Sequence, residues 1–376
     1  MKPARIALAG ALAALAMAAS PPQARADQVR IGVVVAQTGT YAFVGAPLVN
    51  GIRLALDELR ADPSGFGGHE VEVIFEDNRS DKQEAIALIT RLATAEGVDL
   101  IIGPIATSEA MAAGPVANEL QVPMFTTATS PAVLEIGPWI FKSTETADAY
   151  MAPVAMHVVE VAKPKTCFLV SIRDNEGYVR QRNVFRAILE SHGVGIVADE
   201  TILAADTDFT ALATKIVDAD PDCLFVTAPP ETAANLIIQA RQAGLRPDTV
   251  IAGDSGMGSQ KFLDAGGRAV EGVLFPASFV AGSNELSARF AAAYQARYGS
   301  APDLWAATGY TMMQVVANAI RNAGPEINRE TLRAAMAATR DLPVVLGQGR
   351  LSFDENRVPH MGGIVMQIRD GAWVKP

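Results

Sequence analysis

Residues 29–60 read VRIGVVVAQTGTYAFVGAPLVNGIRLALDELR, and this stretch indicates the fold class. Its first eight residues, 29–36, are almost entirely Val, Ile, Gly and Ala, which predicts a strand buried on both faces of a parallel sheet. Residues 45–60 then carry apolar side chains at helical spacing, from Ile52 to Leu59. A buried strand followed by such a helix is the repeating unit of a doubly wound α/β domain.

The same alternation of strand and helix runs twice along the chain. The first series adds strands at 71–75, 100–102 and 122–125, with helices at 81–96 and from about Ser108. The second series begins after Asp148 and predicts strands at 166–171, 196–201, 223–227 and 250–252, with helices at 178–192, 209–219 and 232–244. Two long helices at 285–298 and 304–323 follow, and the tail from Gly349 alternates like strands. We therefore expect an α/β protein with two doubly wound parallel-sheet lobes.

The first 26 residues have the features of an export signal peptide. Lys2 and Arg5 precede an apolar stretch from Ile6 to Met17, and Ala24-Arg25-Ala26 places small residues where a signal peptidase cleaves. The alternative is a membrane anchor, but the apolar stretch is short for spanning a bilayer. No Cys stands at the cleavage point to carry a lipid. We expect a mature periplasmic protein that begins near Asp27 and does not insert into the membrane.

The charge of the chain narrows the range of partners, and the positions of its two cysteines indicate their redox state. The formal net charge is −10, and removal of Lys2, Arg5 and Arg25 with the leader makes it −13 (−10 − 3). An acidic chain without basic clusters is poorly suited to bind nucleic acid or anionic lipid. Cys167 and Cys223 both lie in apolar runs, which favours two buried thiols, although export would permit a disulfide between them.

Three loops that follow strands of the first series are rich in small and hydroxyl residues. They are residues 37–45, 103–108 and 126–131. In an open parallel sheet, ligands bind beyond the carboxyl ends of the strands, where helix N-termini offer free N–H groups to a carboxylate. We predict that these loops grip a ligand carboxylate. The alternative for each hydroxyl is that it only caps its own helix, as Thr129 or Ser130 would do before Pro131.

The corresponding loops of the second series are residues 174–178, 228–230 and 253–256. Tyr178 is placed to cover a ligand with its ring, and Asp254 is placed to face a cationic group. Either residue fits a plain surface position equally well.

Catalytic and metal-binding patterns are weak. Gly253-Asp254-Ser255-Gly256 has the letters that surround a serine-protease nucleophile, so a hydrolase stays open as an alternative. A nucleophile needs a positioned base, however, and the four histidines have neither catalytic context nor metal-ligand spacing: they are His69, His157, His192 and His360. Gly256-Met257-Gly258 lacks the third glycine of a dinucleotide fingerprint, and no P-loop is present. We expect no enzymatic activity, no metal and no cofactor.

Taken together, these motifs resemble the type I periplasmic binding proteins of the branched-chain amino acid (leucine-binding) class, over about Val29 to Val374. The landmarks are Gln37-Thr38-Gly39, Ile101-Ile102-Gly103-Pro104, Val122-Pro123, Asp206-Thr207-Asp208-Phe209 and the late signature of Phe290, Tyr294, Tyr298-Gly299 and Pro302. The resemblance implies a periplasmic binding protein-like I fold: two lobes joined by a three-stranded hinge that closes on a ligand. It assigns 27–145 plus 276–341 to lobe 1, and 146–275 plus 342–376 to lobe 2. It also implies a monomer that delivers a small molecule to an ABC transporter permease.

The resemblance further implies the ligand-binding residues. The positions that hold the ligand carboxylate match Thr107, Thr127 and Thr129. The complete expected set is Tyr41, Phe43, Ile105, Ala106, Thr107, Thr127, Ala128, Thr129, Asn175, Tyr178, Pro229, Asp254 and Ser255. The acidic residue that receives an α-amino group in the family falls on Ser255, with Asp254 one place earlier. This departure opens two ligand classes, a branched-chain or related amino acid and an aromatic or aliphatic acid without an amine.

A ligand-sensing role is the alternative to transport, since the same fold serves as an input module for receptors and as an amide sensor. A fused receptor would need a membrane span and a signalling domain after the binding module. This chain ends at Pro376, so a sensing role would require association with a separate receptor.

Overall fold

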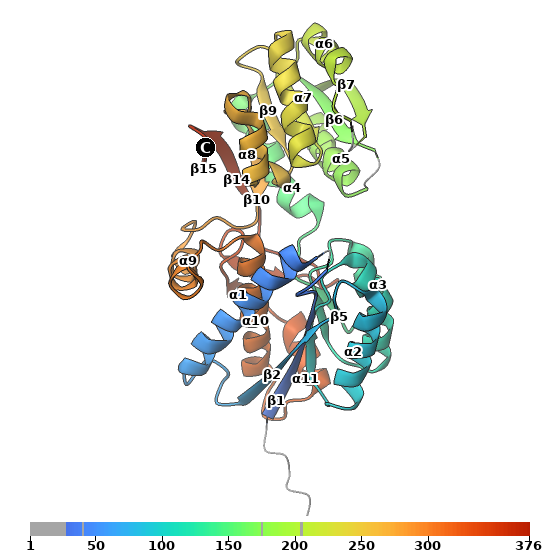
Figure 1. Ribbon diagram of the computed structural model, residues 1–376, viewed down its shortest axis with the longest axis vertical. Coiled ribbons are helices and arrows are strands. Elements are labelled where there is room, and N and C mark those ends of the chain that lie inside the picture. The colour runs from blue at the N-terminus through green and yellow to red at the C-terminus, as the bar shows by residue number, and fades with distance from the viewer. Residues whose placement is uncertain (1–27, 40, 174–175, 204–205) are drawn as a thin grey trace, which may run out of the picture.

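The computed structural model describes residues 28–376 except 40, 174–175 and 204–205. The expected signal peptide and Asn175 therefore lie outside the described residues, as does the side chain of Phe43. Figure 1 shows two lobes, each a sheet covered by helices, with the crossing segments between them. This arrangement confirms the expected α/β class with parallel sheets.

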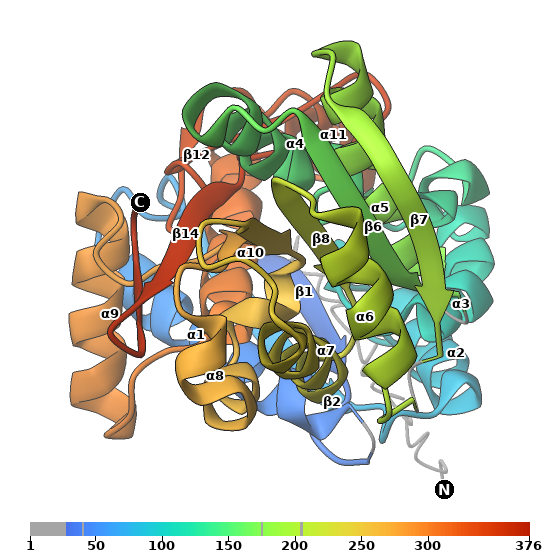
Figure 2. The same ribbon diagram turned by 90° about the horizontal axis from the view of Figure 1, so that it is seen from above.

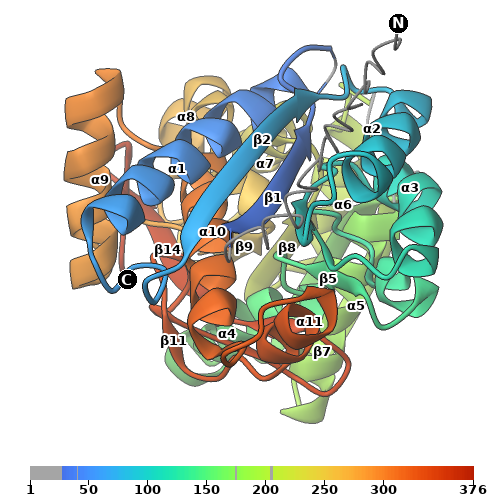
Figure 3. The ribbon, with the colours of Figure 1, turned by 90° about the horizontal axis from the view of Figure 1, so that it is seen from below.

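The first lobe is built on a five-stranded parallel sheet with the order β2-β1-β3-β4-β5. Its strands are β1 (Gln28–Val35), β2 (Glu70–Asp77), β3 (Leu100–Ile102), β4 (Met124–Thr126) and β5 (Ile140–Lys142). One face is covered by α1 (Ala42–Ala61), α9 (Glu285–Tyr298), α10 (Leu304–Asn322) and α11 (Arg329–Ala337), and the other by α2 (Lys82–Thr94) and α3 (Thr107–Glu119). Figure 3 shows these layers from below. The opening Val/Ile run is buried, as expected for a strand covered on both faces.

The second lobe is built on a seven-stranded sheet with the order β15-β14-β10-β9-β8-β6-β7. The parallel strands are β6 (Thr166–Ile172), β7 (Gly195–Ile202), β8 (Cys223–Thr227), β9 (Val250–Gly253) and β10 (Leu274–Ala277). Two antiparallel strands, β14 (Ile364–Arg369) and β15 (Ala372–Val374), complete its edge. One face carries α6 (Thr210–Ala219), α7 (Pro230–Ala243) and α8 (Gln260–Gly266), and the other carries α4 (Ala147–His157) and α5 (Glu176–Ser191) (Figure 2).

Three crossings connect the lobes within the described part of the chain: β5 to α4, β10 to α9, and the segment before β14. Hydrogen bonds tie these crossings together. Oε1 of Glu145, in the first crossing, accepts the backbone N–H groups of Met361 at 2.6 Å and Gly362 at 2.8 Å, in the third. The carbonyl of Ser278, in the second, accepts the N–H of Gly347 at 2.7 Å, and Gly347 lies in the part of the first lobe that precedes the third crossing.

The structure corrects the boundary that we expected at residue 342. Residues 342–360 form a small antiparallel sheet of β11 (Leu342–Pro343), β12 (Arg350–Phe353) and β13 (Pro359–His360), and Leu351 and Phe353 belong to the core of the first lobe. The ring of Phe353 lies 6.1 Å from that of Phe125 and 5.7 Å from that of Phe141, edge to face. The chain joins the second sheet only at Ile364. The alternation of apolar and polar residues in a strand gives no information about which sheet the strand joins. The sequence could therefore not show where the chain passes from the first lobe to the second.

Cys167 and Cys223 lie opposite each other on neighbouring strands, β6 and β8. Both are buried free thiols, and burial raises the pKa of the Cys167 thiol. This agrees with the favoured interpretation of two core cysteines.

None of the helices in the described part of the chain combines the length and the hydropathy that a bilayer-spanning segment requires.

Candidate ligand-binding site

The carboxyl edges of the two parallel sheets face each other where the lobes meet. β5 and β10 both run directly into crossings, and parallel strands end at the same edge of a sheet. The described residues of the loops that follow β1, β3, β4, β6, β8 and β9 therefore lie on the inner side of the molecule (Figure 1). Every predicted ligand-binding residue that the structure describes belongs to one of these loops or to the helix turn after it.

The side chain of Asp77 fixes the loop that follows β1 by accepting hydrogen bonds from it. Asp77, at the end of β2, accepts the N–H groups of Gln37 at 2.9 Å and Thr38 at 3.3 Å, and the Thr38 hydroxyl at 2.7 Å. Burial raises the pKa of Asp77, but these hydrogen bonds, together with one from the Arg79 N–H at 2.8 Å, bring it below its ordinary value. Tyr41 follows in this loop, partly buried, and its N–H donates to Ser80 Oγ at 2.9 Å.

A second internal carboxylate holds the loop before α3. Glu109 is 1% exposed, and its Oε2 accepts the N–H of Ala106 at 3.2 Å. Burial raises the pKa of Glu109, opposed by hydrogen bonds from the Ala106 N–H, the Asn78 amide and the Ile105 N–H. These N–H groups at Ile105 and Ala106 lie beside the predicted carboxylate site. Because Glu109 already occupies them, Ile105 and Ala106 can shape the site but are not its main donors.

The loop after β4 uses one of its predicted hydroxyls internally. Thr127 is 3% exposed, and its Oγ1 donates to the carbonyl of Ile105 at 3.1 Å. Thr126, which sequence reasoning left out of the site, donates to the carbonyl of Pro104 at 2.5 Å and accepts the N–H of Ala128 at 3.0 Å. A hydroxyl has one proton to donate. Thr127 therefore fastens two loops together and can offer a ligand only a lone pair or its backbone.

Thr107 and Thr129 retain hydroxyls for a ligand. Thr107 begins α3, and its Oγ1 accepts the N–H of Ser130 at 3.4 Å, which leaves its proton for another acceptor. Thr129 is exposed. Ser130 instead caps the 3₁₀ turn Pro131–Ile136 by accepting the N–H of Ala132 at 3.3 Å, as the capping alternative predicts. Of the three predicted threonines, two keep a donor for the ligand.

Sequence reasoning missed Lys142 at the end of β5. This lysine is 0% exposed, and its Nζ donates to the carbonyl of Thr129 at 2.8 Å. Burial, and then the positive charge of Arg180 of α5 in the other lobe, lower its pKa to about 8. The signal was available in Trp139-Ile140-Phe141-Lys142, an apolar run that ends on a charged residue next to a crossing.

The second lobe contributes Tyr178 and Asp254. Asp254 is 2% exposed; its Oδ1 accepts the N–H of Gly256 at 2.6 Å and its Oδ2 accepts that of Ala228 at 3.1 Å. Burial raises the pKa of Asp254 to about 7. Tyr178 is partly buried in the first turn of α5; burial, and then the nearby Asp254, raise its pKa to about 12. Asp254 thus ties together the loops after β8 and β9, close to the tyrosine.

Two further predicted residues border this part of the site. Pro229 immediately precedes α7. Ser255 is exposed in the turn after β9, so the position at which the resemblance implies an acid carries an exposed hydroxyl here.

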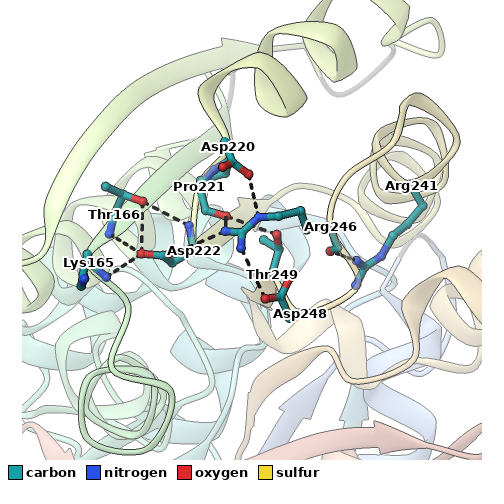
Figure 4. A network of polar contacts seen from close by, with 9 residues as sticks. All are labelled: Lys165, Thr166, Asp220, Pro221, Asp222, Arg241, Arg246, Asp248 and Thr249. Carbon is teal, nitrogen blue, oxygen red and sulfur yellow. Dashed lines mark hydrogen bonds and ion pairs between the residues drawn. The ribbon is translucent and has the colours of Figure 1, made fainter.

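The most densely charged cluster of the second lobe lies at the other end of its sheet. Arg246 pairs with Asp220 at 2.6 Å, Asp222 at 3.2 Å and Asp248 at 3.3 Å, and Asp222 accepts the N–H of Lys165 at 2.8 Å (Figure 4). These residues surround the amino ends of β6, β8 and β9. They join strand starts to helix ends, remote from the predicted site.

Two hollows in the described part of the chain lie away from the facing edges. One of about 570 Å³ is lined by Arg60, His69 and their neighbours at the amino edge of the first sheet, and one of about 250 Å³ is lined by His157, Arg241 and others at the outer end of the second lobe. Neither is lined by a predicted ligand-binding residue. Within the described residues, no cluster of three or more His, Cys, Asp or Glu could hold a metal ion.

Comparison with known proteins agrees with this architecture. Residues 28–372 match the family model of the periplasmic binding proteins. The chain is 25% identical to the leucine-, isoleucine-, valine-, threonine- and alanine-binding protein of Pseudomonas aeruginosa, over 88% of this chain and 87% of that protein.

Solved structures give the same result. A crystal structure from Rhodospirillum rubrum assigned to branched-chain amino acid ABC transport has 27% identity and a TM-score of 0.84, covering 93% of this chain and 100% of that one. The substrate-binding protein LivJ of Streptococcus pneumoniae, solved with isoleucine, has 28% identity and a TM-score of 0.73 over 93% and 100%. The family consists of solute-binding proteins and not of enzymes, in agreement with the expected absence of catalysis. Since the family match spans nearly every described residue, this chain belongs to the type I periplasmic binding proteins, in the branched-chain amino acid class.

Proposed function

We propose that this protein is the solute-binding component of an ABC importer, and that it captures a small carboxylate-bearing molecule between its two lobes. The family and the names of its relatives support a role in transport. The proposed sequence of events is export through the leader, capture in the periplasm, closure of the lobes about the three crossings, and delivery of the ligand to a membrane permease.

Thr107 carries the proposal for a carboxylate. Its hydroxyl stands at the N-terminus of the 13-residue helix α3, where the helix dipole favours negative charge. The N–H of Ser130 occupies a lone pair of this hydroxyl, so the proton is free to point at a ligand oxygen. Asp77 and Glu109 already fill the neighbouring N–H groups. A ligand carboxylate would therefore be bound mainly by Thr107, with Thr129 beside it.

The second lobe supports a broader ligand class than amino acids. Asp254 is buried and already accepts two backbone N–H groups, and Ser255 carries no charge. An α-ammonium group needs an accessible anionic partner, because a buried or poorly paired charge is costly. We propose that the carboxylate is required and the amine is not. Aromatic and aliphatic acids are thus candidates beside the branched-chain amino acids, with Tyr178 packing against the apolar part.

Isothermal titration of the mature protein tests this proposal. The ligands are L-leucine, L-isoleucine, benzoate and isovalerate, each compared with its amide. We expect at least one carboxylate to bind and its amide to bind at least tenfold more weakly. Binding of amides or of neutral sugars, with no carboxylate bound, would contradict the proposal.

The Thr107→Val variant tests the role of the hydroxyl. Valine keeps the shape but removes the donor, so the affinity for the bound carboxylate should fall roughly tenfold or more, as loss of a hydrogen bond to a charged group costs about 1.5–3 kcal/mol. Thr90→Val on α2 is the matched control, since the Thr90 hydroxyl bonds only within its own helix, to the carbonyl of Ile86. Equal affinities in Thr107→Val and wild type would remove Thr107 from the site.

A further inference from the structure

Lys142 is a cation enclosed within the first lobe. It ends β5 and lies in register with Thr126 of β4. Its side chain is 0% exposed, and its Nζ donates to the Thr129 carbonyl at 2.8 Å. Because its pKa remains about 8, the amine still carries its proton at neutral pH.

This charge lacks a counter-charge in the described part of the chain. No carboxylate of the described residues forms an ion pair with Lys142, and the charged group that acts on it is Arg180, another cation, from the second lobe. Lysine is almost never fully buried unless it is paired, because an uncompensated buried charge costs several kcal/mol. A carbonyl oxygen satisfies one of the three N–H donors of the amine but supplies no negative charge.

A single peptide group connects Lys142 to the proposed carboxylate site. The C=O of Thr129 accepts from Nζ of Lys142, and the N–H on the other side of the same peptide bond, that of Ser130, donates to Oγ1 of Thr107 at 3.4 Å. Hydrogen bonds joined head to tail polarise one another. The chain of bonds starts at an ammonium group and ends on a hydroxyl whose proton is free for the ligand.

We propose that Lys142 gives the site its selectivity for anions over neutral molecules of the same shape. It acts as a positioning residue: it orients the Thr129–Ser130 peptide, directs the Thr107 proton toward the ligand, and supplies the positive charge that the ligand neutralises. The inference rests on the proposed carboxylate site. It narrows the ligand to one that is bound as an anion, so that the carboxylate enters with its charge.

A purely structural role for Lys142 predicts a different outcome. If the amine only fastened the loop of residues 127–130, its loss would loosen the site for every ligand and weaken carboxylate and amide equally. If its charge matters, the carboxylate should lose affinity while the amide of the same skeleton loses little. The measured quantity is therefore the ratio of the Kd of the amide to the Kd of the carboxylate.

The test uses Lys142→Met in the mature protein, since methionine fills a similar volume without charge. Titrations at pH 7 and fixed ionic strength compare benzoate with benzamide, L-leucine with L-leucinamide, and isovalerate with isovaleramide. We expect the ratio to fall about tenfold or more in Lys142→Met and to return largely to the wild-type value in Lys142→Arg. Lys82→Met, which removes an exposed lysine from α2 of the same lobe, makes the same change in net charge and should leave the ratio unchanged.

A second pair of variants breaks the connection without touching Lys142. Ser130 has a φ of −67°, which proline adopts, so Ser130→Pro removes the N–H that donates to Thr107. Ser130→Ala removes only the cap on Ala132 and is its control. Ser130→Pro should lower the ratio relative to Ser130→Ala, and this comparison decides the question even if Lys142→Met does not fold.

Two results would overturn the inference. An unchanged ratio in Lys142→Met, with both ligands weakened alike, would leave Lys142 a structural role only; an unchanged ratio in Ser130→Pro would do the same if Lys142→Met does not fold. If the wild-type protein binds none of the four carboxylates titrated for the proposed function, that function itself fails, and the inference fails with it.

Discussion

Charged side chains shape the loops of the candidate site. Asp77 and Glu109 occupy backbone N–H groups of two loops, and Lys142 holds the carbonyl of a third. Each charge fixes a loop conformation and decides which polar groups remain for a ligand. Thr107 and Thr129 remain, and Thr127 does not. At the residue scale, the candidate site depends both on the hydrogen-bond donors that already have partners within the chain and on those that remain for a ligand.

Asp254 should make the stability of the second lobe depend on pH. Its folded-state pKa of about 7 lies above the ordinary value of 3.8, so the folded protein holds this proton more tightly than the unfolded chain. Its contribution is therefore fully present below pH 4, is lost as the pH rises from about 4 to 7, and stays constant above that. We expect Asp254→Asn to reduce the loss of unfolding free energy between pH 5 and pH 8, as measured by urea denaturation.

Asp218→Asn, an exposed aspartate of α6, is the control and should leave that loss as it is in the wild type. An identical loss in Asp254→Asn and wild type would mean that the Asp254 carboxyl is not perturbed.

The sequence predicted which loops follow the strands of the first sheet, but not which of their polar groups stay free of partners within the chain. Strand ends rich in Thr, Gly and Ser located 103–108 and 126–131, because this rule depends only on the order of elements. Which hydroxyl keeps its proton depends on neighbours far along the chain, such as Ile105 for Thr127. The apolar run that ends on Lys142 marks this residue in the local sequence, but its partner, a backbone carbonyl 13 residues away, does not show there.

At the scale of elements, α1 and α10 pack backbone against backbone in the first lobe. A Cβ at Gly51 would lie 1.9 Å from the carbonyl oxygen of Ala306, and a Cβ at Gly309 would lie 2.0 Å from that of Leu48. The two glycines sit at the crossing of the helices, where each backbone packs directly on the other. This contact holds α10, which comes late in the chain, against the first helix.

Gly309→Ala should therefore destabilise the protein although alanine favours helix. We expect a loss of roughly 1–3 kcal/mol in unfolding free energy, typical of overpacking, because a backbone carbonyl cannot move aside as a side chain can. Gly114→Ala on α3 is the matched control: its Cβ would meet the flexible end of Ile136 at 2.7 Å, so its cost should be smaller. Equal effects of the two substitutions would contradict the close contact of α1 with α10.

Long elements were predicted well, and so was the short strand β3 (Leu100–Ile102), whereas the short elements β5 and α11 were missed. The helix expected at 304–323 corresponds to α10 (Leu304–Asn322), and the strand expected at 223–227 to β8. Periodicity needs several turns or alternations to be visible. β5 has three residues and α11 has nine, and both form because the helices and loops around them bury their apolar side chains. Tertiary contacts of this kind leave little trace in local sequence.

At the scale of the whole molecule, Glu145 joins the first and third crossings. Its Oε1 accepts both the Met361 and Gly362 N–H groups, while burial raises the pKa of its carboxyl. Glu145→Gln keeps an oxygen at this position, whereas Glu145→Ala leaves two N–H groups unpaired. We expect Glu145→Ala to lose roughly 2–4 kcal/mol of unfolding free energy, at about 1–2 kcal/mol per unpaired group.

Glu145→Gln should lose much less, because it also removes the cost of burying a charge. Urea denaturation of both variants checks this, and equal losses in the two would show that the acceptor oxygen does not matter.

The proposed function depends on features at all three scales. The crossings hold the two lobes with their sheet edges facing each other, helices start at these edges, and Thr107 lies at one of the helix starts. The most direct test is a crystal structure of the protein with the tightest-binding carboxylate from the titrations. We predict a carboxylate oxygen about 2.7 Å from Oγ1 of Thr107, Tyr178 against the apolar part of the ligand, and the two lobes closer together than in Figure 1. A ligand bound away from the facing edges, or bound there with its carboxylate turned away from Thr107, would contradict the account.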